Sequence, residues 1–196
     1  TGPPGRPLRA GASVIDVTGG MFGVVAILAA LNERHSTGRG QMVQSALFET
    51  TVYLIGQHMA QKAVTGRAAD PMPARISAWA IYDVFETRDD PIFIGVVTDA
   101  LWEKFCKLFG LDDLWADESI RANNARVQAR DRILPRIREL IAGFTRAELI
   151  ERLEGSGLPF APIARPQDMF DDPHLNASGG LEPVTLADGT QTALPA

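Results

Sequence analysis

The chain has 196 residues, and 19 lysines and arginines stand against 24 aspartates and glutamates, which gives a formal charge of −5. Apolar residues make up 45% and charged residues 22%, the balance of a globular protein rather than a disordered or fibrous one. This acidic balance argues against a nucleic-acid-binding surface as the main function. The single cysteine, Cys106, excludes an intramolecular disulfide framework and a multi-cysteine metal site, and it fits a reducing compartment.

Neither end of the chain has the pattern of a natural terminus. The chain begins at Thr1 in the Pro/Gly-rich stretch TGPPGRP. It stops at Ala196, directly after residues with the pattern of a strand. We therefore expect a fragment of a longer protein, inactive when alone. The longest apolar run, residues 21–31, is about half of what a bilayer span needs, and no signal-peptide pattern precedes it. We expect a cytoplasmic protein with no membrane partner.

The first part of the chain predicts alternating strands and helices. Residues 8–15 have the pattern of a short strand, and a strongly apolar helix follows over residues 21–34. A second strand is predicted over 42–47, and a second helix over 48–63, where apolar residues recur at a helical period. This order predicts a piece of an α/β sheet layer over residues 1–63.

A change of pattern marks a second domain. Residues 64–78 contain two prolines and a run of small residues, which is typical of a linker. Beyond it, residues 79–172 predict a small α+β domain. Residues 173–196 are predicted to lead the chain out of this domain. The predicted elements, in chain order, are strands 80–87 and 91–97, a helix from Thr98 to Phe109, helices over 128–143 and 145–154, a strand over 160–163, a helical turn over 166–170 and a hairpin over 181–194.

Asp16 is the residue with the greatest potential for chemistry. It is predicted at a strand-to-helix junction, where backbone N–H groups and the helix dipole favour a carboxylate. Gly19 and Gly20 would let another molecule approach the backbone closely. An ionised carboxylate in this position could attack an activated acyl group. The alternative is that Asp16 is only an N-cap, and the local pattern taken alone favours that alternative.

The other candidate residues do not form a reactive group. His35, His58 and His174 are spread over a helix end, a helix and a loop, so the sequence predicts no histidine metal site or triad. Cys106 lies in the amphipathic stretch FCKLF and is predicted to be a core residue. Tyr82, on the predicted hairpin, could project its phenol into a cleft, although strand tyrosines usually serve packing. These features alone predict no reaction.

A longer stretch of the sequence resembles a known protein family. Residues 13–50, SVIDVTGGMFGVVAILAALNERHSTGRGQMVQSALFET, resemble the central segment of the family III CoA-transferases, the CaiB/BaiF group, which includes formyl-CoA transferase and α-methylacyl-CoA racemase. The shared pattern is an aspartate, here Asp16, then Gly19-Gly20, an apolar helix and a TG-x-GQ phrase over 37–41. WAIYDVFETRDDPIFIGVV and GLPFAPIARPQDMFDDPHLNASG resemble parts of the small domain, so the resemblance runs over nearly the whole chain.

The resemblance implies an architecture and a set of partners. The fold class is α/β: residues 1–63 belong to a Rossmann-like large domain that carries Asp16, the 64–78 linker joins it to the small α+β domain over 79–172, and residues 173–196 return towards the large domain. The protein is expected to be an interlocked homodimer that acts on acyl-CoA and a carboxylic acid acceptor. Coenzyme A takes part as a thioester substrate, so we expect no separate cofactor and no metal. Most CoA contacts in the family come from a half that this chain lacks.

The resemblance also implies a mechanism. Asp16 matches the catalytic aspartate, whose carboxylate attacks the acyl-CoA thioester and gives a mixed anhydride and free CoA thiolate. The acceptor acid then replaces the first acid in the anhydride, and the CoA thiolate takes up the new acyl group. Gly19 and Gly20 are expected to bind substrate and to help supply backbone N–H donors to the oxyanions. Tyr82 matches a tyrosine near the active site and is expected to contact substrate.

Two alternatives to CoA transfer stay open. An acyl-CoA racemase of the same family would use Asp16 as an acid or base, but the racemase has a glutamate at the position that aligns with Thr98, which favours a transferase. Formyl-oxalate exchange is not supported, because the stretch before the hairpin, PMPARISAWA, lacks the expected glycines. The second alternative is an inactive fragment.

Overall fold

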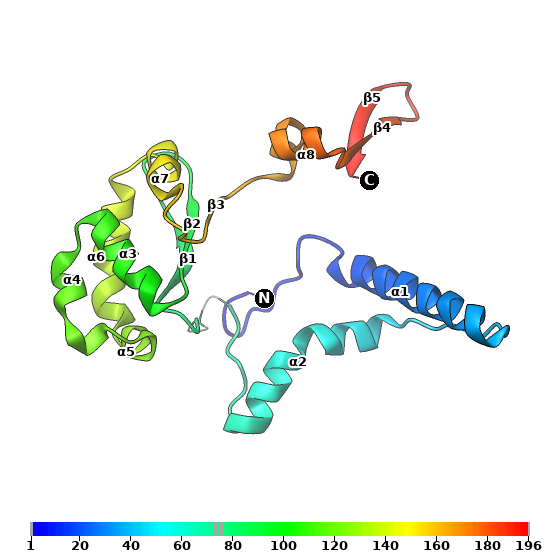
Figure 1. Ribbon diagram of the computed structural model, residues 1–196, viewed down its shortest axis with the longest axis horizontal. Coiled ribbons are helices and arrows are strands. Elements are labelled where there is room, and N and C mark those ends of the chain that lie inside the picture. Colours follow the sequence, from blue (N-terminus) through cyan, green and yellow to red (C-terminus); the bar gives the residue numbers. More distant parts are fainter. Residues whose placement is uncertain (1, 73, 75–76, 196) are drawn as a thin grey trace. The chain divides into compact units, whose positions relative to one another are not determined.

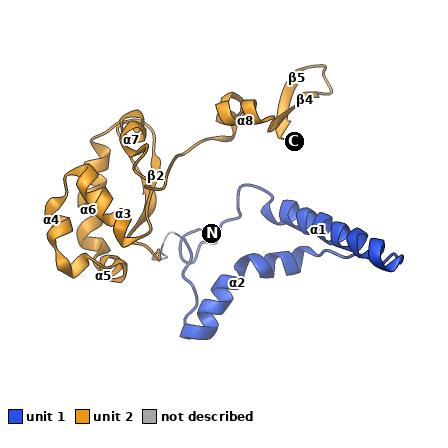
Figure 2. Cartoon of the chain, viewed as in Figure 1, with its two compact units in different colours: residues 1–76 blue, residues 77–196 orange. Residues whose placement is uncertain are grey.

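The computed structural model describes residues 2–72, 74 and 77–195. They form two compact units, an N-terminal unit over 1–76 and a C-terminal unit over 77–196 (Figure 2). Three residues of the predicted linker, namely 73, 75 and 76, lie outside the described residues. The first two residues of that linker, Val64 and Thr65, belong to a helix.

Two helices make up the regular structure of the N-terminal unit, α1 (Val14–Thr37) and α2 (Leu47–Thr65) (Figure 1). The strands predicted over 8–15 and 42–47 are wrong, since the described part of this unit contains no strand. Ala46 does have extended backbone angles, φ −123° and ψ 139°. Extended residues become a strand only when a neighbouring strand accepts and donates their backbone hydrogen bonds, and no described residue does so here.

The two helices make contact through a glycine. Gly19 is buried in α1, and a Cβ atom at this position would lie 2.5 Å from Cδ2 of Leu47 on α2. The Ser45 hydroxyl, in the connection before α2, donates a hydrogen bond to the Gly19 carbonyl oxygen over 2.9 Å. Phe22 and Tyr53 meet edge to face, with ring centroids 5.4 Å apart. The missing side chain of Gly19 therefore allows the helices to approach.

Most apolar side chains of this helix pair face outward. A helix that is apolar on every side is normally covered by other elements. The exposed large apolar residues are Val14, Val17, Met21, Phe22, Val24, Val25, Ile27, Leu28 and Leu31 on α1, and Leu47, Phe48, Tyr53, Leu54, Ile55, Met59 and Val64 on α2. The N-terminal unit thus leaves a large apolar area without a described partner.

By length and composition alone, α1 could cross a lipid bilayer. It has 24 residues, and its most apolar 18-residue window has a mean hydropathy of 2.1, with 6% of that window buried. The uninterrupted apolar run, residues 21–31, is shorter than this window, which also includes polar residues of α1. Core helices of water-soluble proteins pass the same test, so this property is weak evidence for a membrane span.

A three-stranded antiparallel sheet forms the centre of the C-terminal unit. Its strands are β1 (Ile81–Phe85), β2 (Ile92–Val96) and β3 (Phe160–Pro162), in the order β1-β2-β3. In the register Ile81 pairs with Val96 and Phe85 with Ile92, and all four side chains are buried. Helices cover this face of the sheet in Figure 1. The predicted hairpin is confirmed.

Two helices of this unit begin at residues that cap them with side-chain hydrogen bonds. The Thr98 hydroxyl accepts a hydrogen bond from Leu101 N at the start of α3, and Thr145 and Glu148 form a reciprocal capping box at the start of α7. The predicted helix over 128–143 is confirmed as α6, which covers 130–142. The short helices α4, α5 and α8 escaped prediction. The bounds are α3 (Asp99–Phe109), α4 (Asp112–Ala116), α5 (Asn123–Gln128), α6 (Arg130–Ala142), α7 (Arg146–Leu153) and α8 (Pro173–Ser178).

The remaining elements are two 3-10 helices and a hairpin. The bounds are η1 (Glu118–Ile120), η2 (Pro166–Asp171), β4 (Leu181–Thr185) and β5 (Gln191–Pro195). Strands β4 and β5 pair with each other around a turn, as predicted.

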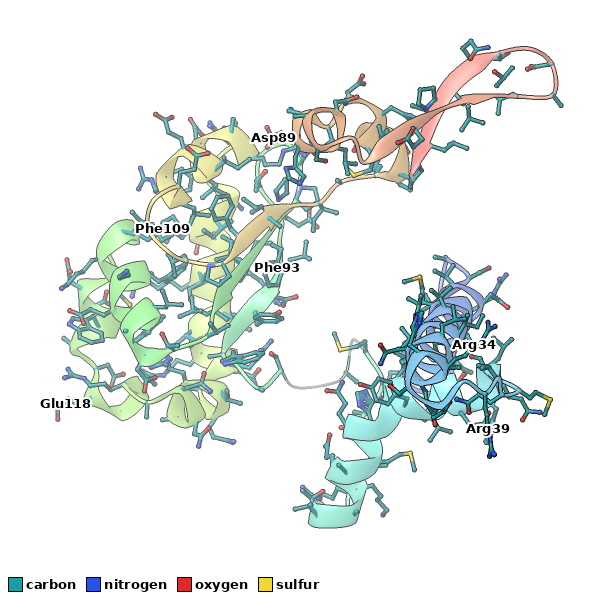
Figure 3. The ribbon with its side chains drawn as sticks, turned by 45° about the vertical axis from the view of Figure 1, so that its right-hand side comes forward. Arg34, Arg39, Asp89, Phe93, Phe109 and Glu118 are labelled. Carbon is teal, nitrogen blue, oxygen red and sulfur yellow. The ribbon has the colours of Figure 1, made fainter. Side chains whose placement is uncertain are left out.

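All buried apolar residues of the described chain lie between Ala80 and Leu158. They include Trp102, Phe105 and Phe109 on one face of α3, as predicted, and Figure 3 shows Phe109 among the helices. Burial of such large side chains stabilises the C-terminal unit by about 1.5–3 kcal/mol each. The core of the described chain therefore belongs to the C-terminal unit.

One charged side chain lies inside this core. Arg126, on α5, has only 1% of its side chain exposed, and its guanidinium lies 5.2 Å from the centre of the Trp102 ring. It donates hydrogen bonds to the backbone carbonyls of Ile120, over 3.1 Å, and of Arg121, and it pairs with the carboxylate of Asp99. Arg126 thus joins three separate segments of the unit.

Candidate active site

Asp16 lies in the first turn of α1, at its third helical residue. The helix starts at Val14, so the predicted strand-to-helix junction is wrong at this point, and Ser13 rather than Asp16 occupies the N-cap position. The side chain of Asp16 is exposed and forms no hydrogen bond or ion pair with another described residue. The N-cap alternative for Asp16 is therefore wrong, and its carboxylate is open to a ligand.

The helix start also supplies free hydrogen-bond donors beside this carboxylate. In an α-helix the first N–H groups have no intrahelical acceptor, and here these belong to Val14, Ile15 and Asp16. The dipole of α1 adds a partial positive charge at the same end, which favours an anion. The N–H groups of Gly19 and Gly20 lie one turn further on and bond within the helix.

Three glycines follow Asp16 on its own face of α1. Gly19, Gly20 and Gly23 stand three, four and seven residues after Asp16, the spacings that share one helix face. A Cβ atom at Gly20 would meet nothing within 4 Å, whereas at Gly19 it would meet Leu47. The structure thus places Gly20 on open backbone beside Asp16, and Gly19 in the contact with α2.

A hollow lies between the two helices beyond this face. It measures about 410 Å³ and is lined by Phe22, Gln44, Ser45, Ala46, Glu49, Thr50 and Tyr53. Asp16 does not line it. The hollow combines two aromatic rings with the Glu49 carboxylate and the Ser45 hydroxyl, so its wall is partly apolar and partly polar.

Tyr82 belongs to the C-terminal unit, on β1. It stands on the face of the sheet opposite the helices, and 41% of the residue is exposed. Its ring contacts Trp79 and Phe93, with centroids 4.9 Å and 4.8 Å away. The structure thus brings Asp16, Gly19 and Gly20 together on one helix and holds Tyr82 in an aromatic cluster of its own.

The remaining chemical candidates have structural roles. Cys106 is fully buried, as predicted, and burial raises the pKa of its thiol to about 12, so it carries no thiolate at neutral pH. Thr98 caps α3, so its hydroxyl already accepts a hydrogen bond from Leu101 N. Among the described residues, no three His, Cys, Asp or Glu side chains lie close enough to hold a metal ion.

Sequence reasoning expected free N–H groups near Asp16 but placed the start of the helix too late, at residue 21 instead of Val14. The signal was present in Ser13-x-x-Asp16, since serine at an N-cap with an acidic residue three positions later is a common helix start. The β-branched Val14 and Ile15 pointed to a strand instead. A helix start at Val14 moves the two glycines from a loop into the helix.

The whole chain matches a protein-family model. Residues 1–196 match the model described as CoA-transferase family III. An acyl-CoA transferase of Fusarium pseudograminearum is 34% identical over 173 residues, which are 88% of this chain and 38% of that protein. The succinate–glutarate CoA-transferase of Agrobacterium fabrum is 27% identical over 188 residues, or 96% of this chain and 47% of that protein. This chain spans less than half of either relative.

Solved structures agree on the fold. A CaiB/BaiF family protein from Brucella suis covers 100% of this chain with a TM-score of 0.73 and 27% identity, and this chain covers 56% of it. A hypothetical protein of Mycobacterium tuberculosis, 22% identical, has a TM-score of 0.78 over 100% of this chain and 51% of its own. The expected mixed helix and sheet fold is confirmed, and this chain belongs to CoA-transferase family III.

Proposed function

We propose that the chain carries the nucleophile of a CoA-transferase that moves CoA between carboxylic acids, and that this nucleophile is Asp16. The observation that supports the proposal most directly is the exposed Asp16 carboxylate, without a described partner, in the first turn of a helix. A carboxylate with no salt bridge or hydrogen bond to release can attack a thioester at the smallest energetic cost. The chain's family membership supplies the reaction class.

The proposed reaction passes through an anhydride. An oxygen of Asp16 attacks the acyl carbon of the acyl-CoA, the C–S bond breaks, and CoA leaves as a thiolate. The acceptor carboxylate attacks the aspartyl carbon of this anhydride, so the first acid leaves and a second anhydride forms. The CoA thiolate then attacks the new acyl carbon, and Asp16 departs as the carboxylate with which it began. Each of the three attacks passes through a tetrahedral intermediate, whose oxyanion needs hydrogen-bond donors.

The start of α1 has groups suited to these steps. The free N–H groups of Val14, Ile15 and Asp16 are donors to an oxyanion, a role that we assign to them in place of the helical N–H groups of Gly19 and Gly20. Gly20 leaves room for the thioester to reach the carboxylate. The dipole of α1 adds a partial positive charge at the end of the helix where the negative charge of the intermediates would develop.

Dicarboxylic acids are the substrates to test first. Relatives of this chain include a succinyl-CoA:glutarate CoA-transferase of Mus musculus, 29% identical, and a succinyl-CoA:mesaconate CoA-transferase of Haloarcula hispanica, 30% identical. Each name joins succinyl-CoA to a second dicarboxylic acid. We infer that this chain serves an enzyme with a dicarboxylate donor and a dicarboxylate acceptor.

We further propose that the chain works in the cytoplasm as part of a longer polypeptide and in a homodimer. The uncovered apolar sides of α1 and α2 support this, because such helices need protein around them. The curated relatives carry more than half of their length outside the matched region. That additional sequence, together with the partner subunit, would cover these helices and supply the CoA contacts. The 196 residues alone would then be inactive.

Racemisation is the competing chemistry in this family. The residue at the position where the racemase has its glutamate is Thr98, and its hydroxyl is engaged as the cap of α3. A second acid or base is therefore not supplied from this position. The observation favours transfer over proton abstraction.

A coupled experiment tests the proposal. The longer protein is incubated with succinyl-CoA and free glutarate, and glutaryl-CoA is measured by mass spectrometry for the native protein, Asp16→Asn and Asp112→Asn. Asp112 is a matched control, because it is also exposed in the first turn of a helix, α4. We expect transfer by the native protein and the control, and a loss of at least 1000-fold in D16N. Full activity of D16N would refute the proposal, and substrate deuteration in heavy water without transfer would favour racemisation.

A further inference from the structure

The hollow between α1 and α2 lies close to the turn of α1 that carries Asp16. Ser45 lines this hollow, and its hydroxyl donates a hydrogen bond to the carbonyl oxygen of Gly19 over 2.9 Å. Gly19 follows Asp16 by three residues on the same helix face, about 4.5 Å further along the helix axis. The volume of about 410 Å³ is within the range of small-molecule sites. A ligand that reacts at Asp16 can therefore extend into this hollow.

Two polar side chains of the wall are free to bind a ligand. The hydroxyls of Ser45 and Thr50 each donate their one hydrogen to a backbone carbonyl, over 2.9 Å and 3.0 Å, so neither has a hydrogen left for a ligand. Glu49 and Gln44 are exposed, and their side chains form no hydrogen bond or ion pair with another described residue. A carboxylate only accepts hydrogen bonds, whereas the Gln44 amide also donates them. The wall thus offers one strong acceptor and one donor.

The charge and the apolar part of the wall restrict the ligand further. Among the described residues that line the hollow, Glu49 alone is charged. A carboxylate or a phosphate of a ligand would be repelled by Glu49, and the described wall has no cation to compensate. The rings of Phe22 and Tyr53, which meet edge to face, give the hollow an apolar side suited to methylene groups. The wall therefore favours a neutral chain that combines methylene groups with a secondary amide.

We propose that this hollow binds the pantetheine arm of the acyl-CoA, and that Glu49 accepts a hydrogen bond from the amide N–H nearest the sulfur. Gln44 donates a hydrogen bond to an amide carbonyl of the same arm. The inference rests on the proposed function, because it takes the acyl-CoA as the substrate of Asp16. Two methylene groups separate this amide nitrogen from the sulfur, so the amide lies a short step from the thioester. The distal carboxylate of a dicarboxylic acyl group would point away from Glu49.

A cycle of one substitution and one substrate change tests this contact in the longer protein. The substrates are succinyl-CoA and an analogue in which a methylene group replaces the amide N–H nearest the sulfur, with glutarate as acceptor. We expect Glu49→Ala to lower kcat/KM for succinyl-CoA about tenfold, the worth of one hydrogen bond to a charged group. The same variant should process the analogue as well as the native protein does, because the hydrogen bond is already absent. The native protein should process the analogue about tenfold less well than succinyl-CoA.

A second variant and a matched control accompany this cycle. Glu49→Gln keeps the size of the side chain and an acceptor oxygen but removes the charge, so its loss with succinyl-CoA should be smaller, about threefold. It decides the question if E49A fails to fold. Glu118→Ala is the control, because Glu118 is also exposed and its side chain has no described partner, but it lies in the C-terminal unit, where Figure 3 labels it. Its activity with both thioesters should stay at the native level.

The outcomes separate the inference from the proposed function. Equal losses of E49A or E49Q with both thioesters would overturn the inference, because Glu49 would then contact polypeptide rather than the amide of the arm. Native activity of both variants with succinyl-CoA would overturn it as well. If the native longer protein transfers no CoA from succinyl-CoA to glutarate, the proposed function is overturned, and the inference falls with it.

Discussion

Replacement of the buried Arg126 by methionine should weaken the C-terminal unit severely. Methionine keeps much of the length and apolar stem of arginine but removes the guanidinium, which donates to the carbonyls of Ile120 and Arg121 and pairs with Asp99. The hydrogen bond to the Ile120 carbonyl is buried, and a buried carbonyl left without a donor costs about 1–3 kcal/mol. The Asp99 side chain is 59% exposed, so water can solvate its carboxylate after the change.

These contributions predict a loss of about 2–5 kcal/mol in the free energy of unfolding. Such a loss is a large part of the roughly 5–15 kcal/mol that holds a typical domain together. Urea unfolding followed by tryptophan fluorescence measures it, because Trp102 lies in the buried core beside Arg126. The midpoint should fall while the slope of the transition stays the same.

Arg132→Met is the matched control for this experiment. Arg132 is also paired with an aspartate, Asp117, but its side chain is 56% exposed, and exposed ion pairs contribute about 0–1 kcal/mol. The reasoning predicts a small effect for R132M and a large effect for R126M. A loss below about 1 kcal/mol in R126M would refute the reasoning, because it would mean that the carbonyls find other donors.

Three further predictions follow from single residues. Because burial raises the pKa of Cys106 to about 12, the native chain should not react with a thiol reagent at pH 8. The urea-unfolded chain should react completely, and fast labelling of the native chain would contradict this prediction. The backbone N–H of Arg146 is the main cause that lowers the pKa of Asp89 to about 2, so Asp89 stabilises the fold above pH 4 and loses this effect as the pH falls towards 2. The stability of Asp89→Asn should depend less on pH in that window, and an unchanged profile would speak against the contact. In the 196-residue chain Gly20 and Gly56 both occupy open helix positions, so Gly20→Ala and the control Gly56→Ala should each raise its stability by about 0.5–1 kcal/mol. In the longer protein only G20A should lower transferase activity, and equal activity of both variants would exclude a need for bare backbone beside Asp16.

Local signals were sufficient for most of the C-terminal unit. Thr98, the Thr145–Glu148 capping box and the turn at Asp89-Asp90 each determine their own element, because the stabilising contacts lie within a few residues. Gly38 likewise ends α1 with a φ of 69°, the left-handed conformation that glycine adopts most easily at a helix end. The short helix α5 begins after Ala122, whose side chain forms no cap hydrogen bond, and the sequence did not predict this helix.

The N-terminal unit was harder to predict, because its elements depend on distant neighbours. Ala46 is extended, yet residues 42–46 form no described strand, and the pattern of a strand carries no information on whether a partner strand is present. Asp16 was identified by the sequence motif that it shares with the family. The local pattern alone would not identify it, since a lone aspartate near a helix start is usually a cap. Its actual surroundings, a helix face lined with glycines, follow from the helical period once Val14 is known to start α1.

The central claim is that Asp16 becomes acylated. The most direct measurement incubates the longer protein with succinyl-CoA and hydroxylamine, which converts an aspartyl anhydride or thioester into a stable hydroxamate, and then maps the modified residue by peptide mass spectrometry. The account predicts a hydroxamate at Asp16 that requires acyl-CoA and is absent from Asp16→Asn. An enzyme that transfers CoA at its normal rate while Asp16 stays unmodified under these conditions would contradict it.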